Sequence, residues 1–135
     1  MKIDGGCHCG AIRYEAEVDP AKVMICHCTD CQTLSGSAFR TVVPVARDNF
    51  RLVKGSPKVY MKTAESGNKR QQAFCADCGT PIYSAAERDT PVYSLRAGTA
   101  RQRDQLKPLA QAWKRSALTW LPGFPGTREF ERSVS

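Results

Sequence analysis

Short stretches in which apolar and polar residues alternate run through the first hundred residues of the chain. In residues 11–18, Ile12, Tyr14, Ala16 and Val18 fall on one face of an extended chain, with charged residues between them. Frequent Gly, Pro, Asp and Asn residues end such stretches after four to eight positions, so the pattern predicts an all-β domain. The expected strands are Ala11–Val18, Lys22–Ile25, Ala38–Val45, Phe50–Val53, Lys58–Met61, Gln71–Phe74, Pro81–Ser84 and Val92–Leu95.

The last third of the chain fits two patterns. A strand fits residues 110–114, yet apolar residues in the same region also recur at helical spacing. The helical pattern consists of Leu106, Ala110, Trp113, Ala117 and Leu121. Pro and Gly residues follow from position 122 and indicate a loop and a tail. Because 135 residues suffice for one ordinary domain, we assign residues 1–121 to that domain and 122–135 to the C-terminal loop and tail.

The composition is that of an ordinary globular protein. Hydrophobic residues make up 41% and charged residues 24% of the chain, which excludes an intrinsically disordered protein. No apolar run approaches the roughly 18 residues that a membrane helix requires, so we expect no membrane partner. The first six residues lack the apolar stretch of a secretion signal. We therefore expect a cytoplasmic protein, in which cysteines stay reduced.

The cysteines carry most of the chemical information in this sequence. The seven are Cys7, Cys9, Cys26, Cys28, Cys31, Cys75 and Cys78. An odd number cannot all pair in internal disulfides, and clustered thiols in a reducing compartment more often bind metal. They form a CxC, a CxCxxC and a CxxC motif. In CxxC, a tight turn lets two thiolates reach one tetrahedral zinc ion, so we expect the protein to bind Zn²⁺.

The spacing of the cysteines suggests two zinc ions per chain. The three cysteines of the CxCxxC motif lie within six residues, so one local turn can bring them to one ion. The expected sites are a closed one of Cys7, Cys9, Cys75 and Cys78 and an open one of Cys26, Cys28 and Cys31. Structural zinc contributes about 10–16 kcal/mol in small peptides, so we expect loss of the closed site to unfold much of the protein.

Other ligand sets are also compatible with the spacing. Cys28 and Cys31 could join the CxxC motif in a zinc ribbon, although the 43 residues between them exceed the usual ~15–20. His8 and His27 could also bind metal. A histidine inside such a turn more often donates a hydrogen bond to a ligand or faces solvent.

Three protein thiolates would leave one position of a tetrahedral zinc ion open, as in catalytic sites. Such a complex has a net charge of −1 and is a weak Lewis acid, so it generates hydroxide poorly. It would instead bind an external thiol. A free thiol has a pKa of ~8.5 and is largely protonated at neutral pH, and the zinc ion would cause it to lose that proton on binding. The site therefore favours thiol chemistry over hydrolysis. With water in the fourth position, the site would be structural only.

The formal net charge of +7 suggests nucleic-acid binding as an alternative. Thiolates on two zinc ions would lower that charge, and only two adjacent basic pairs occur, at residues 69–70 and 114–115. Aromatic and basic residues do not alternate as they do in proteins that stack bases. We therefore regard nucleic acid as an unlikely partner. A zinc-containing module that binds another protein is the remaining non-catalytic alternative.

Four segments resemble the GFA family of glutathione-dependent formaldehyde-activating enzymes. They are Gly6–Gly10 with Tyr14, Cys26–Gln32, Ser35–Phe39, and Phe74–Thr80 with Tyr83. Their order and spacing are similar over roughly the first 100 residues. Toward the C-terminus the likeness is looser, because the family usually has a Pro-Trp pair where this chain has Leu118-Thr119-Trp120.

The resemblance implies a fold, two metal sites and a reaction. The fold is a β-tent of small antiparallel sheets held together by zinc, with a strand near Leu109–Lys114 and at most a short helix after it. The site of Cys7, Cys9, Cys75 and Cys78 holds structural zinc, and Cys26, Cys28 and Cys31 hold catalytic zinc. The implied enzyme is a carbon–sulfur lyase that joins formaldehyde to glutathione, giving S-hydroxymethylglutathione, or cleaves that adduct. One relative is a centromere protein, so the domain also serves in a binding role.

Basic residues near the motifs are candidates for binding the two carboxylates of glutathione. They are Arg13, Arg40, Arg70 and Arg96. Asp30 lies between two of the expected zinc ligands and could relay a proton. The alternative role for Asp30, which we favour, is to cap the turn.

Overall fold

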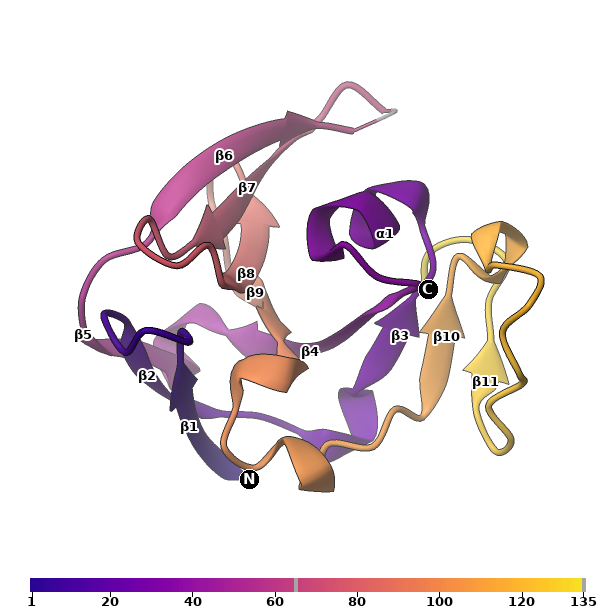
Figure 1. Cartoon of the computed structure of the whole chain (residues 1–135), viewed down its shortest axis with the longest axis horizontal. Coiled ribbons are helices and arrows are strands. Elements are labelled where there is room, and N and C mark those ends of the chain that lie inside the picture. Colours follow the sequence, from indigo (N-terminus) through magenta and orange to yellow (C-terminus); the bar gives the residue numbers. More distant parts are fainter. Residues whose placement is uncertain (65, 135) are drawn as a thin grey trace.

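Over its described residues the protein is mainly β, as predicted, and contains two sheets and one α-helix (Figure 1). The computed structural model describes residues 1–64 and 66–134. The smaller sheet has three antiparallel strands in the order β1 (Lys2–Gly6), β2 (Arg13–Glu17) and β5 (Phe50–Lys54).

The larger sheet has eight strands in the order β11-β10-β3-β4-β9-β8-β7-β6. Their bounds are β3 (Met24–Cys26), β4 (Arg40–Ala46), β6 (Lys58–Thr63), β7 (Lys69–Phe74), β8 (Pro81–Ala86), β9 (Val92–Arg96), β10 (Ala110–Ala112) and β11 (Arg128–Glu129). Neighbours are antiparallel except at β10, which runs parallel to both β3 and β11. Figure 1 shows this sheet curving around the helix α1 (Thr29–Ser35).

Each of the eight expected strands overlaps an observed one, and two further strands were not predicted. Strand β1 contains one large apolar residue and two glycines, so it has no alternation that would predict it. Strand β11 is only two residues long. The strand expected near Leu109–Lys114 is confirmed as β10, and a single short 3-10 helix follows it.

Short helices connect the strands. Helix α1 begins after Cys28, whose sulfur accepts a hydrogen bond from Cys31 N at 3.3 Å, and ends at Gly36, which has a left-handed backbone with φ of 62°. The 3-10 helices are η1 (Pro20–Lys22), η2 (Arg47–Asn49), η3 (Ala97–Thr99), η4 (Arg103–Gln105) and η5 (Lys114–Ser116). Among the described residues, none of the helices has the length and apolar character needed to span a bilayer.

An aromatic cluster joins the two sheets. The alternating side chains predicted to share one face of β2, from Ile12 to Val18, are all buried. Tyr14 of that face stacks on Phe50 with ring centroids 5.4 Å apart, and Phe50 contacts Tyr83 and Tyr93 of the larger sheet at 5.5 and 5.4 Å. These rings bury large apolar areas, so they fix the two sheets in one arrangement.

The C-terminal segment packs beside the CxCxxC region. Phe124 contacts Phe39 edge to face, with ring centroids 5.4 Å apart, and Phe39 in turn lies against His27. Strand β11 then adds to the edge of the larger sheet next to β10. Residues after position 121 therefore help to position the segment that carries Cys26 and Cys28.

Candidate functional site

Four cysteines meet where the two sheets come together. Cys7 and Cys9 follow β1, and Cys75 and Cys78 lie between β7 and β8. Their four sulfurs all lie within 4.8 Å of one another, with Cys7 and Cys9 sulfurs 3.6 Å apart and Cys9 and Cys75 sulfurs 3.8 Å apart. Zinc–sulfur bonds of ~2.3 Å in a tetrahedron place the sulfurs about 3.8 Å apart. The four-cysteine group can therefore hold a metal ion.

Hydrogen-bond donors next to this group favour the thiolate form. Ile12 N donates to Cys7 Sγ at 3.2 Å. The Thr80 hydroxyl lies 3.2 Å from Cys78 Sγ, and its hydrogen bond lowers the pKa of Cys78 to about 5. Metals bind the thiolate rather than the thiol, so both contacts prepare the sulfurs for a cation.

Three cysteines form a second group at the start of α1. Cys26 ends β3, Cys28 caps the helix and Cys31 lies in its first turn. The three sulfurs lie within 4.8 Å of one another, and each residue is half-buried. The zinc-ribbon alternative would require Cys28 and Cys31 to lie beside Cys75 and Cys78, whereas the structure places these pairs in separate groups.

Crowding of the three sulfurs makes their protonation interdependent. Hydrogen bonds from Cys26 and Cys31 lower the pKa of Cys28 to about 2, and the Lys62 charge acts in the same direction. The pKa of Cys26 is raised, because its proton is held in a hydrogen bond to Cys28 and because its thiolate would lie beside another. A divalent cation would remove this conflict by binding all three as thiolates. The chemistry of the group therefore fits a metal ion.

His27 lies between Cys26 and Cys28 in the sequence, but it is not a member of the three-cysteine group. Its ring is 1% exposed, and Nε2 lies 2.8 Å from Gln111 Oε1. Gln111 donates its amide to Thr127 Oγ1 at 2.7 Å, so its oxygen faces His27 and His27 Nε2 donates. Gln32 Nε2 also donates to the His27 carbonyl at 2.8 Å. His27 thus fixes the cysteine turn against β10. His8 is exposed and lies outside both groups.

A cavity of about 510 Å³ opens beside the three-cysteine group. Cys26 and Cys31 line it, together with Arg40, Arg70 and Arg96 from β4, β7 and β9. A neighbouring hollow of about 750 Å³ contains Cys28. Lys62 and Asp30 line both spaces, and their charged groups pair at 2.8 Å.

Several sequence-based assignments change at this site. Of the four candidate arginines, Arg13 is absent from the cavity wall, because it lies on β2 near Gly10. The prediction that Asp30 caps the turn is wrong, because the Cys28 sulfur is the cap and Asp30 pairs with Lys62. Lys62 and Gln111 were not predicted. Lys62 lies on the distant strand β6, and Gln111 is a single polar residue inside an apolar stretch, which was the one available signal.

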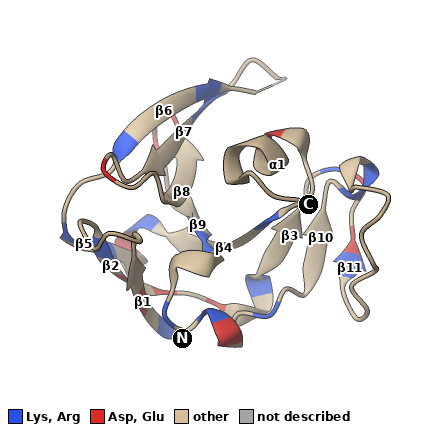
Figure 2. Ribbon diagram, in the orientation of Figure 1, with Lys and Arg blue, Asp and Glu red and all other residues tan. Residues whose placement is uncertain are grey.

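Charged residues are spread over the whole molecule. Figure 2 shows Lys and Arg on both sheets with acidic residues among them, a distribution that does not favour a nucleic-acid interface. The basic residues that stand out are the three arginines inside the cavity.

Comparison with known proteins places this chain among relatives. The model of a family described as glutathione-dependent formaldehyde-activating enzyme matches residues 2–116. A relative from Schizosaccharomyces pombe, described as an uncharacterized lyase, is 28% identical over 100 residues, which cover 71% of this chain and 66% of the relative. A crystal structure of a Rhodobacter sphaeroides protein superposes with a TM-score of 0.61 at 20% identity, covering 78% of this chain and 96% of that one. It shares the fold. The chain belongs to the GFA family, the family of glutathione-dependent formaldehyde-activating enzymes.

Proposed function

We propose that the protein is a zinc-dependent carbon–sulfur lyase acting on the adduct of a thiol and an aldehyde, such as glutathione and formaldehyde. The family match and the relative described as a lyase support this class of enzyme. The observation that carries the proposal is the three-cysteine group. Among residues 1–64 and 66–134, no fourth His, Cys, Asp or Glu side chain joins the three cysteines, and the group lines a cavity.

In this proposal the two cysteine groups have different roles. Cys7, Cys9, Cys75 and Cys78 would hold a structural zinc ion, because four thiolates close its coordination. Cys26, Cys28 and Cys31 would hold the second ion, which when bound supplies a position where an external thiol loses its proton at neutral pH. His27, Gln32 and Gln111 would keep the cysteine turn in place through their hydrogen bonds.

The addition reaction requires one proton to move from sulfur to oxygen. As the carbon–sulfur bond forms, the π bond of the aldehyde breaks and its oxygen becomes an alkoxide, which takes up the proton that the thiol has lost. The reverse reaction breaks the carbon–sulfur bond and regenerates thiol and aldehyde. The Lys62 ammonium lines the cavity, where its pairing with Asp30 holds it in place, and it would relay this proton. It would donate to the developing alkoxide, and the proton lost by the thiol would restore the ammonium, so no proton is gained or lost overall.

Exchange spectroscopy tests this proposal directly. NMR of glutathione and formaldehyde should show faster exchange with S-hydroxymethylglutathione when the zinc-loaded protein is present. A Cys28→Ser variant should lose the acceleration, whereas Ser37→Ala, outside both cysteine groups, should keep it. An equal exchange rate with and without the fully zinc-loaded protein would contradict the proposal.

A further inference from the structure

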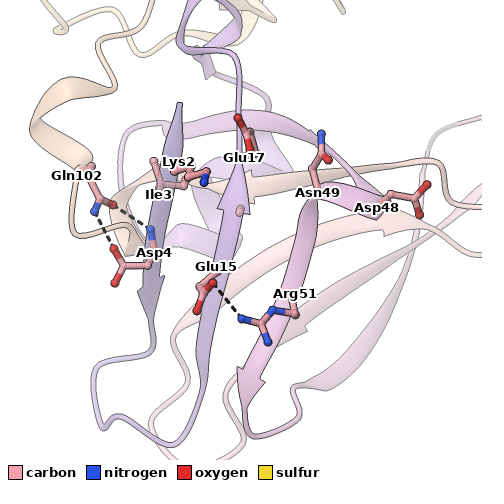
Figure 3. Close-up of a pocket in the computed structure, with 10 residues that line it drawn as sticks. Lys2, Ile3, Asp4, Glu15, Glu17, Asp48, Asn49, Arg51 and Gln102 are labelled. Atoms are coloured by element: carbon pink, nitrogen blue, oxygen red, sulfur yellow. Dashed lines mark hydrogen bonds and ion pairs between the residues drawn. The ribbon is translucent and has the colours of Figure 1, made fainter.

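The cavity beside the three cysteines differs in its charges from the hollow in Figure 3. That hollow, on the surface of the smaller sheet, is lined by side chains of both charges, and two of its carboxylates are paired: Glu15 accepts from Arg51 at 3.0 Å and Asp4 accepts from Gln102 at 2.7 Å. The cavity beside the cysteines instead contains three arginines, and its carboxylate, Asp30, is already bound to Lys62.

Two of these arginines are buried without enough partners. Arg40 is 6% exposed and Arg96 is 8% exposed. Within the described ranges, Arg40 Nε and Nη2 and Arg96 Nε are buried and have no hydrogen-bond partner. Arg96 Nη2 donates to Gln72 Oε1 at 2.9 Å, and Arg70 Nη2 donates to Ser84 Oγ at 3.3 Å, so the existing partners are neutral.

Buried cations without an anion are costly to a fold. Burial, together with the positive charges of Arg40 and Arg70, lowers the pKa of Arg96 to about 9. Arg96 still keeps its charge at neutral pH. Buried charges in proteins are normally paired, and guanidinium groups bind carboxylates through two parallel hydrogen bonds. The three arginines therefore form a site prepared for an anionic group.

The thiolates of the cysteine group do not satisfy this requirement alone. Three thiolates and one divalent metal ion carry a net charge of −1, whereas three guanidinium groups carry +3. Positive charge would thus remain in the cavity after the metal has bound. An incoming thiolate would neutralise one further charge, and a carboxylate on the same molecule would meet the arginines that line the cavity.

We propose that Arg40 and Arg96, assisted by Arg70, bind a carboxylate of the substrate and restrict the enzyme to thiols that carry a carboxylate. This inference rests on the proposed thiol-binding role of the three-cysteine group. It makes the arginines specificity-determining residues. The carboxylate lies in the same cavity as the sulfur, because Arg40 and Arg96 line the wall that also contains Cys26 and Cys31.

Two small thiols that differ in one group provide the test. Zinc-loaded protein would be titrated calorimetrically with 3-mercaptopropionate and with 2-mercaptoethanol, which carry a carboxylate and a hydroxyl at corresponding positions. We expect the carboxylate thiol to bind at least about tenfold more tightly, as for a charge-assisted hydrogen bond in a buried site. In Arg40→Gln and Arg96→Gln this preference should disappear, with little change for the neutral thiol.

A matched control and a second measurement separate binding from folding. Arg47→Gln changes an exposed arginine outside the cavity and should keep the preference. Arg40→Gln should melt no lower than the wild type, because it removes an unpaired buried charge. Arg40→Lys should recover only part of the preference, since lysine lacks the two-pronged donor.

The outcomes distinguish this inference from the proposed function. Equal binding of both thiols to wild-type protein would overturn the inference and leave thiol binding at the zinc site standing. Equal weakening of both thiols in the arginine variants would also overturn it, because that result indicates a structural role. Failure of both thiols to bind zinc-loaded wild-type protein would overturn the proposed function itself.

Discussion

Cys28 belongs to the three-cysteine group and also caps helix α1, so its replacement separates metal binding from folding. In Cys28→Ser the serine oxygen can still cap the helix, because serine is a preferred residue at that position. We therefore expect metal content to fall from two ions per chain to one while the fold persists. Elemental analysis and circular dichroism measure the two quantities.

The control for this substitution lies on the same helix. Thr33→Ser should leave two ions per chain, because Thr33 is outside the group. Unfolding of Cys28→Ser, or retention of two ions, would show that the three-cysteine group is not a separate, dispensable metal site.

Gly5 tests how closely strand β1 approaches the segment at η3. A Cβ at Gly5 would lie 2.1 Å from the carbonyl oxygen of Thr99, so Gly5→Ala requires the backbone to move. We expect Gly5→Ala to lower the free energy of unfolding by about 1–3 kcal/mol, as overpacking does. Gly98→Ala, where a Cβ meets nothing within 4 Å, should have little effect. Urea denaturation checks both; equal stabilities would contradict this close contact.

Single residues were predictable to different degrees. The sequence spacing predicts the CxCxxC and CxxC turns, because cysteines within one short turn lie close together. Arg40, Arg70 and Arg96 could be named only as neighbours of motifs, because their convergence depends on how β4, β7 and β9 lie in the sheet. Lys62 could not be named, since nothing local marks a lysine on β6 as part of the site.

At the scale of elements, β1 is held to the segment between η3 and η4 by Asp4. Arg101 donates to Asp4 through Nε at 2.7 Å and Nη2 at 3.0 Å, and Gln102 Nε2 donates at 2.7 Å. The Arg101 hydrogen bonds, followed by that of Gln102, lower the pKa of Asp4 below its ordinary 3.8. A carboxylate whose pKa is lowered in the folded state stabilises the fold above the unfolded pKa.

The predicted pH dependence follows from the sign of that shift. At pH 7, wild-type protein should melt higher than Asp4→Asn. The difference should shrink as the pH falls below 3.8 and vanish below the folded pKa, because Asp4 is then protonated in both states. Glu15→Gln, which breaks the more exposed pair with Arg51, should shift the melting temperature less. A difference between wild type and Asp4→Asn that is independent of pH would show that the charge of Asp4 is not responsible.

Elements with a periodic pattern were predictable, and elements defined by contacts were not. Alternation identified β2 because one of its faces is buried. Strand β1 has no such alternation and becomes a strand because it pairs with β2. Helix α1 has seven residues and no buried residue, so helical periodicity could not reveal it. Its start is set by the sulfur of Cys28, a residue to which the sequence analysis assigned only metal binding.

At the scale of the whole molecule, the four-cysteine group connects the two sheets. Cys7 and Cys9 lie between β1 and β2 of the smaller sheet, and Cys75 and Cys78 lie between β7 and β8 of the larger one. The aromatic cluster of Tyr14, Phe50, Tyr83 and Tyr93 also connects the sheets. Without a cation, four crowded sulfurs must keep protons or repel one another, so the metal ion is expected to be part of the fold.

Removal of metal should therefore affect the two groups differently. A structural zinc ion contributes about 10–16 kcal/mol in small peptides, which is comparable with the ~5–15 kcal/mol that stabilises a whole domain. We expect a strong chelator to abolish cooperative thermal unfolding of the wild-type protein, and Cys75→Ser to do the same without chelator. Calorimetry of the protein before and after chelation measures this.

The Cys28→Ser variant provides the decisive comparison, because it should retain only the four-cysteine site. Before chelation it should unfold cooperatively, as the wild type does. Chelation should abolish that transition, because it removes the ion that joins the two sheets. Adding back one equivalent of zinc should restore the transition. A metal-free Cys28→Ser protein that still unfolds cooperatively near the wild-type temperature would show that the four-cysteine site is not needed to hold the two sheets together.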